Sequence, residues 1–159
     1  MLSLSTRGLS GLALLVLSAT PSLAAAPTPD SGSTAWILTA SALVLFMTLP
    51  GLALFYGVLV HARNVLSVLM QCFAICCIAS VLWAICGYSL VFDGDGALIG
   101  TLHKAFLAHL EPLRTGTLLP EPVFALYQMT FAVITPALII GAIPERVAFP
   151  FVALFSALW

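Results

Sequence analysis

Three long stretches that contain no Asp, Glu, Lys, Arg or His constrain this sequence more than any other feature. They cover residues 35–60, 64–92 and 122–143. Each is longer than the roughly 20 apolar residues that an α-helix needs to cross a hydrocarbon core of about 30 Å. We therefore predict three transmembrane helices, at about residues 34–60, 64–92 and 121–143.

The composition excludes a soluble domain. Of the 159 residues, 62% are hydrophobic and only 7% are charged, which leaves too little polar surface to face water. The formal net charge is −1 and no basic patch stands out, so no nucleic-acid partner is expected. The fold class that follows is an all-α transmembrane helical bundle, with the lipid bilayer as its surroundings.

The extreme N-terminus has the layout of a secretory signal. Arg7 precedes an apolar run over residues 8–19, and small residues follow Pro21 up to a cleavage site near Ala24 or Ala26. We predict a cleavable signal peptide at residues 1–26, with a retained N-terminal anchor as the alternative. Cleavage would leave the mature N-terminus outside the cytoplasm, and residues 27–159 as one membrane domain.

Two details refine this helical pattern. Pro50-Gly51 should kink the first helix, because proline removes a backbone donor and crowds the preceding turn. A fourth apolar run starts at Val147, and its roughly 13 residues are too short to span the bilayer. We therefore expect the sequence to stop inside a truncated fourth helix at residues 147–159.

Cysteines and histidines are the residues most able to suggest a metal or cofactor. Cys72 and Cys76 share a helix face, but two ligands are too few for a closed metal site, and packing is the simpler interpretation. The histidines lie in turns or in the loop between the second and third helices, where they could neither ligate haem within a span nor relay protons across it. No metal and no cofactor are expected from Cys72, Cys76, Cys77, Cys86, His61, His103 or His109.

The third stretch carries an aromatic face. Tyr127 and Phe131 are four residues apart, Phe124 lies one turn earlier, and Gln128 and Thr130 stand beside them. Ordinary helix packing is one interpretation; the other is a mouth that attracts cations, since a desolvated cation over an aromatic ring gains about 2 kcal/mol. Burying a bare ion nominally costs tens of kcal/mol, so such rings could collect ammonium but could not carry it across as an ion.

Longer residue strings point to a family. They are residues 42–57 with the Arg63–Ser67 turn, Leu82-Trp83 with residues 87–90, and residues 127–142 with Glu145-Arg146. In this order they closely resemble the first helices of the Amt/Mep/Rh ammonium transporters. The resemblance implies a homotrimer of eleven-helix protomers with inverted repeats, of which this chain would form roughly the first 3.5 helices.

The same resemblance assigns roles to the aromatic face. It implies that Phe131 is a pore gate and that Tyr127 belongs to the outer vestibule that binds ammonium, with Gln128 and Thr130 in support. The family often has Phe where this chain has Tyr127. Its pore histidines, pore aspartate and vestibule tryptophan belong to later helices, so none of the histidines named above corresponds to them.

The function implied is nitrogen uptake as ammonium or ammonia through a hydrophobic pore in the cell (inner) membrane, by a multi-pass protein. A PII-type regulatory protein is a further partner that the family suggests. An enzyme is not expected, because the spans lack a paired nucleophile and base. The alternative is a truncated fragment that does not transport, or a relative that senses ammonium.

Overall fold

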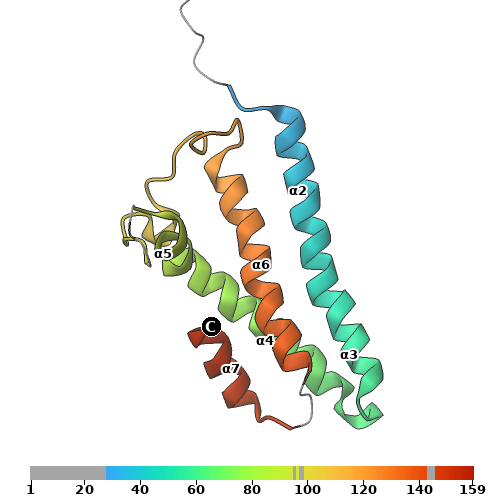
Figure 1. Ribbon diagram of the computed structural model, residues 1–159. Helices are drawn as coiled ribbons and strands as arrows, with labels where there is room; N and C mark the ends of the chain where they lie inside the picture. Colours follow the sequence, from blue (N-terminus) through green and yellow to red (C-terminus); the bar gives the residue numbers. More distant parts are fainter. Residues whose placement is uncertain (1–27, 95, 97–98, 143–145) are drawn as a thin grey trace, which may run out of the picture.

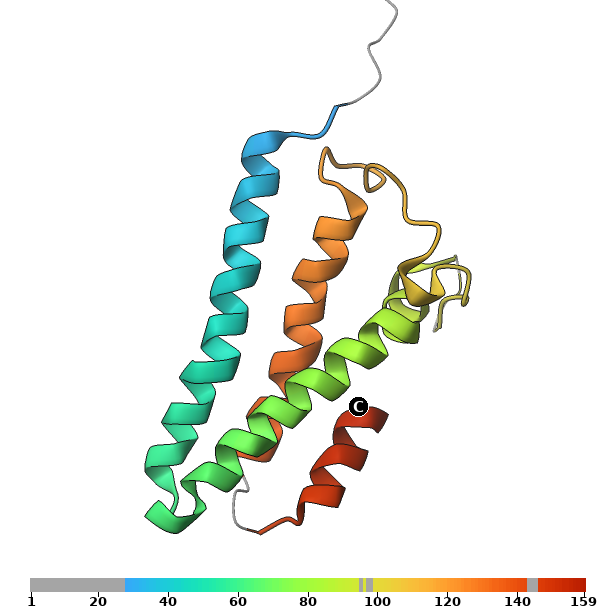
Figure 2. The same cartoon turned by 180° about the vertical axis from the view of Figure 1, so that it is seen from behind.

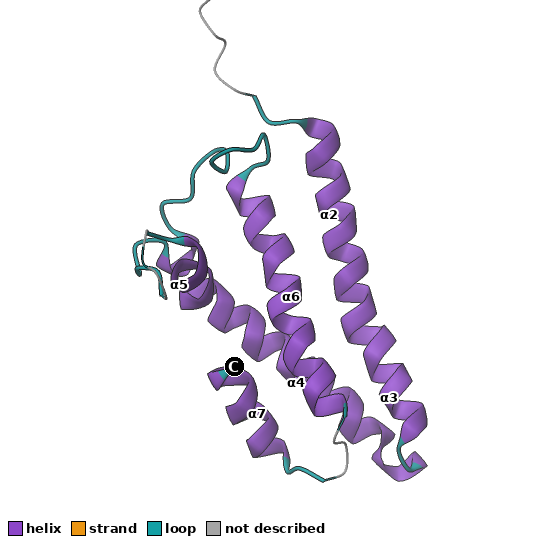
Figure 3. Ribbon diagram, in the orientation of Figure 1, coloured by secondary structure: helices purple, strands orange, loops and turns teal. Residues whose placement is uncertain are grey.

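The computed structural model describes residues 28–94, 96, 99–142 and 146–159, and all regular structure among them is helical (Figure 3). Three segments are long and apolar enough to cross a membrane: Ser31–Leu59, Ala62–Phe92 and Glu121–Ile139. The predicted all-α transmembrane fold class is confirmed. The predicted signal peptide at residues 1–26 lies outside the described residues.

The first long segment consists of α2 (Ser31–Phe46), the π-helical turn η1 (Met47–Leu52) and α3 (Ala53–Leu59). Asp30 caps its start by accepting hydrogen bonds from the backbone N–H groups of Gly32, at 3.2 Å, and Ser33, at 3.1 Å. Pro50 lies inside η1. The irregularity expected at this proline takes the form of a π-helical turn, since Pro50 has no N–H to offer the preceding turn.

The second long segment turns back, packs against α3 and η1, and then diverges from the first segment (Figures 1 and 2). After the short 3₁₀ turn η2 (Ala62–Asn64) the chain forms α4 (Val65–Leu82), the π-helical turn η3 (Trp83–Gly87) and α5 (Tyr88–Phe92). The two views of the ribbon show the resulting antiparallel hairpin (Figures 1 and 2).

The rest of the chain is a long loop and two helices. The loop contains the 3₁₀ turn η4 (Ala105–Leu107), and the helices are α6 (Glu121–Gly141) and α7 (Phe149–Leu158). α6 packs against α2 and α4, and α7 packs mainly against α4. α2 and α6 begin at the same end of the bundle, beside the long loop, and the η2 turn lies at the opposite end (Figure 1). We call these the loop end and the turn end.

Small side chains form much of the interior. One buried cluster contains Ala53, Tyr56, Val68 and Cys72, and another contains Ile75, Ala137 and Val152. Small residues let helices approach closely, as is usual between membrane helices. Large apolar side chains meanwhile cover the outside, so the bundle has the surface of a protein surrounded by lipid or by further helices; examples are Trp36, Phe46 and Val58.

Candidate functional site

Tyr127 and Phe131 form an edge-to-face aromatic pair on α6. Their ring centroids are 5.1 Å apart and the ring planes meet at 84°. This arrangement is favoured by the quadrupoles of the two rings. The Phe131 side chain is 44% exposed, and Tyr127 is half-buried. The structure therefore brings the two predicted site residues together on an accessible face of the helix.

The two predicted supporting residues differ in what they can offer. Thr130 is fully buried, and its hydroxyl donates a 2.7 Å hydrogen bond to the carbonyl of Tyr127. A hydroxyl bonded to its own helix backbone supports that turn of the helix and is occupied. Gln128 is half-buried, so this residue is less enclosed than Thr130.

An aromatic cluster joins α6 to the hairpin at the loop end. Tyr88 and Phe92 have ring centroids 5.3 Å apart, and Phe92 lies edge-to-face against Phe124 of α6 at 5.1 Å. Trp83 contacts both Tyr88 and Phe92, and its indole N–H donates a 3.1 Å hydrogen bond to the carbonyl of Ala125. The start of α6 is thus fixed against η3 and α5, one turn before Tyr127.

Glu121, the first residue of α6, has a nearly buried carboxylate with three donors. The Tyr88 hydroxyl donates to it at 2.7 Å and the Lys104 ammonium at 2.6 Å, and the backbone N–H of Glu111 donates to its second oxygen at 2.5 Å. A buried carboxylate is tolerated only with partners of this kind. The carboxylate therefore joins α5, the long loop and α6. The sequence pattern alone did not indicate this role for Glu121, although an acid at the edge of an apolar span is a visible signal.

Arg114 of the long loop lies over the aromatic cluster. Its Cζ is 3.6 Å from the ring centroid of Phe124 and 5.0 Å from that of Phe92, which are cation–π distances. The guanidinium borders a cavity of about 170 Å³ whose lining is mostly polar: Phe92, Lys104, Glu111, Arg114, Thr115 and Glu121. The sequence alone gave Arg114 no role.

The cysteines and histidines lie elsewhere. Cys72 is buried in the core between α3 and α4, and all four cysteines are free thiols. His103 and His109 stack on each other within the long loop, with ring centroids 4.7 Å apart. Among the described residues there is no group of three or more His, Cys, Asp or Glu side chains that could hold a metal ion.

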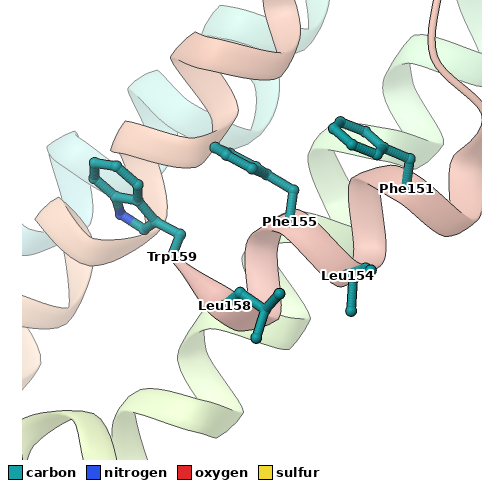
Figure 4. A pocket seen from close by; sticks show the side chains of 5 residues that line it. All are labelled: Phe151, Leu154, Phe155, Leu158 and Trp159. Atoms are coloured by element: carbon teal, nitrogen blue, oxygen red, sulfur yellow. The ribbon is translucent and has the colours of Figure 1, made fainter.

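Three apolar hollows border α7. One, of about 330 Å³, lies along its stacked rings (Figure 4) and is lined by Phe151, Leu154, Phe155, Leu158 and Trp159. A second, of about 380 Å³, lies between α7 and the second long segment, next to Ala132 of α6. A third, of about 490 Å³, lies between α4 and α7. Their linings contain no ionisable side chain other than the thiols of Cys77 and Cys86, whereas the ion pair and the cation–π contacts of the described residues lie at the loop end.

Comparison with known proteins decides the family. The model of the Ammonium Transporter Family matches residues 35–159. This chain belongs to the ammonium transporter family. The resemblance inferred from the sequence strings is confirmed, and the family is one of transporters, which agrees with the expectation that the chain is not an enzyme.

Relatives extend the match along most of the chain. A putative ammonium transporter of Methanothermobacter thermautotrophicus is 42% identical over 133 residues, covering 82% of this chain and 33% of the relative. The ammonium transporter of Bacillus subtilis is 42% identical over 130 residues, covering 80% of this chain and 32% of the relative.

Solved structures of family members have the same arrangement of helices. Candida albicans Mep2 superposes with a TM-score of 0.71 at 31% identity, covering 83% of this chain and 29% of that one. Saccharomyces cerevisiae Mep2 gives 0.70 at 31% identity, covering 83% of this chain and 30% of that one. This family member therefore spans about a third of the length of the relatives it matches.

Proposed function

We propose that the protein containing this chain transports ammonium across a membrane through an apolar pore, with Tyr127 in the vestibule and Phe131 as a gate. The observation that carries the proposal is the edge-to-face pair that these rings form on α6, where both are partly exposed. The chain that presents this pair belongs to a family of ammonium transporters. Gln128 would assist binding at the vestibule, and Thr130 would hold the backbone of Tyr127 in place.

The cost of burying an ion favours transport of the neutral molecule over transport of the ammonium ion. An aromatic face can attract a cation with about 2 kcal/mol, but an ion inside an apolar span pays a far larger burial cost, nominally tens of kcal/mol. Residues 122–143 contain no ionisable Asp, Glu, Lys, Arg or His that could offset this cost. Ammonium would therefore be captured at the mouth, give up its proton, and cross as the neutral molecule, while the proton returns by a separate route.

The surroundings of the transporter belong to the same proposal. The loop end would face outward and the turn end would face the cytoplasm, as the signal-like N-terminus suggests. The membrane would be the cell (inner) membrane and the assembly a homotrimer, with a PII-type protein as a cytoplasmic partner. The orientation is supported by the signal-like N-terminus alone, and the homotrimer and the PII-type partner by the family resemblance.

Growth provides a direct test. A strain without ammonium transporters, given the full reading frame that contains this chain, should grow on low ammonium as the sole nitrogen source. The same strain with an empty vector should not. If the protein reaches the membrane and growth is still not restored, the transport proposal is wrong and a non-transporting sensor relative becomes the better account.

A further inference from the structure

Arg114 places a fixed positive charge at the start of α6. Its guanidinium carbon lies 3.6 Å from the Phe124 ring centroid, and Phe124 is one helical turn before Tyr127 and Gln128. The second ring beneath it, Phe92, holds the guanidinium from the side of α5. Because both rings belong to the packed helices, the charge keeps its position relative to the proposed vestibule even though Arg114 comes from a loop.

Three other charged side chains, those of Lys104, Glu111 and Glu121, line the cavity that Arg114 borders. Lys104 and Glu121 form an ion pair at 2.6 Å, so their charges largely cancel. Glu111 borders the same cavity as Arg114, but its side chain is exposed to solvent and accepts a 3.4 Å hydrogen bond from the Thr115 hydroxyl. Among the described residues, Arg114 is the one whose charge lies over the rings of Phe124 and Phe92, at cation–π distances.

We propose that Arg114 determines how strongly the mouth favours a neutral molecule over a cation, by repelling cations from the Tyr127 vestibule. This inference rests on the proposed transport function. Ammonium is attracted by the aromatic rings but repelled by the guanidinium, so its capture is weaker than the rings alone would allow. A neutral molecule experiences no such repulsion.

The size of the effect follows from Coulomb's law. Two like charges separated by roughly 10 Å at a partly solvated surface interact weakly, and salt at 0.1 M screens them over a Debye length of about 10 Å. Removal of the charge should therefore lower the KM for a cationic substrate by about two- to tenfold. The effect should shrink as the ionic strength rises.

The test compares Arg114→Gln, Arg114→Lys and Arg63→Gln in the full-length protein. The readout is uptake of labelled methylammonium by transporter-deficient cells, at low and high concentrations of sodium gluconate. Arg114→Lys keeps the charge, and Arg63→Gln removes an exposed charge at the turn end, far from α6's start. We expect a two- to tenfold lower KM for Arg114→Gln only, with a KM that depends less on salt than in the parent protein.

Other outcomes separate the two proposals. A merely structural role for Arg114 would lower the maximal rate or raise the KM, and either result would overturn the inference. So would an unchanged KM in Arg114→Gln, or an equal fall in KM in Arg114→Lys. Absence of saturable uptake in the parent protein would overturn the transport function itself, and with it this inference.

Discussion

The hydroxyl of Tyr56 donates a 3.3 Å hydrogen bond to the carbonyl of Leu138, which joins the end of α3 to the last turn of α6. The N–H of Ala142, which would bond Leu138 in a regular α-helix, instead bonds Ile139 at 3.2 Å. Tyr56 thus satisfies a carbonyl that the tightened helix end leaves free. The Tyr56 ring lies so close to Gly141 that a Cβ on that glycine would overlap it.

Gly141→Ala should therefore destabilise the protein. We expect a loss of about 1–3 kcal/mol, typical of an overpacked core, because the added methyl must displace a buried ring. Gly51→Ala is the matched control, since a Cβ there would meet ordinary contacts of 3.5 Å and beyond. Unfolding of the purified proteins in detergent measures both. Equal stability of the two variants would show that the Tyr56 ring moves away freely.

The spans and the aromatic pair could be predicted because each is a local property of the chain. Apolar runs longer than the bilayer is thick must become helices, since lipid offers no partner for backbone groups. Tyr127 and Phe131 had to share a face because four residues make about one helical turn. Pro50 likewise signalled a disturbed helix from its covalent structure alone.

The contacts of the long loop could not be predicted in this way. Tyr88 and Lys104 reach Glu121 across 33 and 17 positions of sequence. Nothing in the local pattern shows which loop residue will face the start of α6, because that depends on how the whole loop folds over the aromatic cluster. The same holds for the guanidinium of Arg114 over Phe124.

Lys104→Met should test the ion pair at the loop end. The variant leaves the nearly buried carboxylate of Glu121 without its counter-charge, and loss of one partner of a buried pair is strongly destabilising. We expect a loss of about 2–4 kcal/mol, below the range for a fully buried pair because Lys104 is partly exposed. Detergent unfolding measures the change.

The double variant Lys104→Met with Glu121→Gln provides the control for this ion pair. It removes the uncompensated charge, so it should recover part of the stability lost in the single variant. If the double variant is no more stable than Lys104→Met alone, the carboxylate is not the source of the loss.

Asp93 supplies a prediction about pH. The hydrogen bond from the Thr101 hydroxyl holds the pKa of this carboxyl below its ordinary value of 3.8, aided by the backbone N–H of His103 at 3.1 Å. Because its pKa is lowered in the folded protein, ionised Asp93 stabilises this loop fully at a pH above its ordinary pKa. This contribution is lost as the pH falls through the lowered pKa. Thr101→Val should raise the pKa of Asp93.

A carbon-13 NMR titration of the Asp93 carboxyl measures this change. Thr115→Val is the control, because the Thr115 hydroxyl donates to Glu111 instead. A titration of Asp93 that is identical in the parent protein and in Thr101→Val would contradict the assigned cause of the shift.

Phe131→Ala and Cys76→Ala should separate the proposed gate from packing. Phe131→Ala removes one ring of the edge-to-face pair at the proposed mouth, so we expect saturable uptake to fall several-fold. Cys76 is a half-buried thiol on α4, and its replacement by another small side chain should leave uptake nearly unchanged. A large defect in Cys76→Ala with normal membrane levels would count against packing as the role of this cysteine.

Uptake of labelled methylammonium by transporter-deficient cells tests the central claim most directly. The cells express the full reading frame that contains this chain, and the protein is first shown to be in the membrane. We predict saturable uptake that unlabelled ammonium competes away. Uptake no greater than in cells with an empty vector would contradict the claim that this member of the ammonium transporter family transports ammonium.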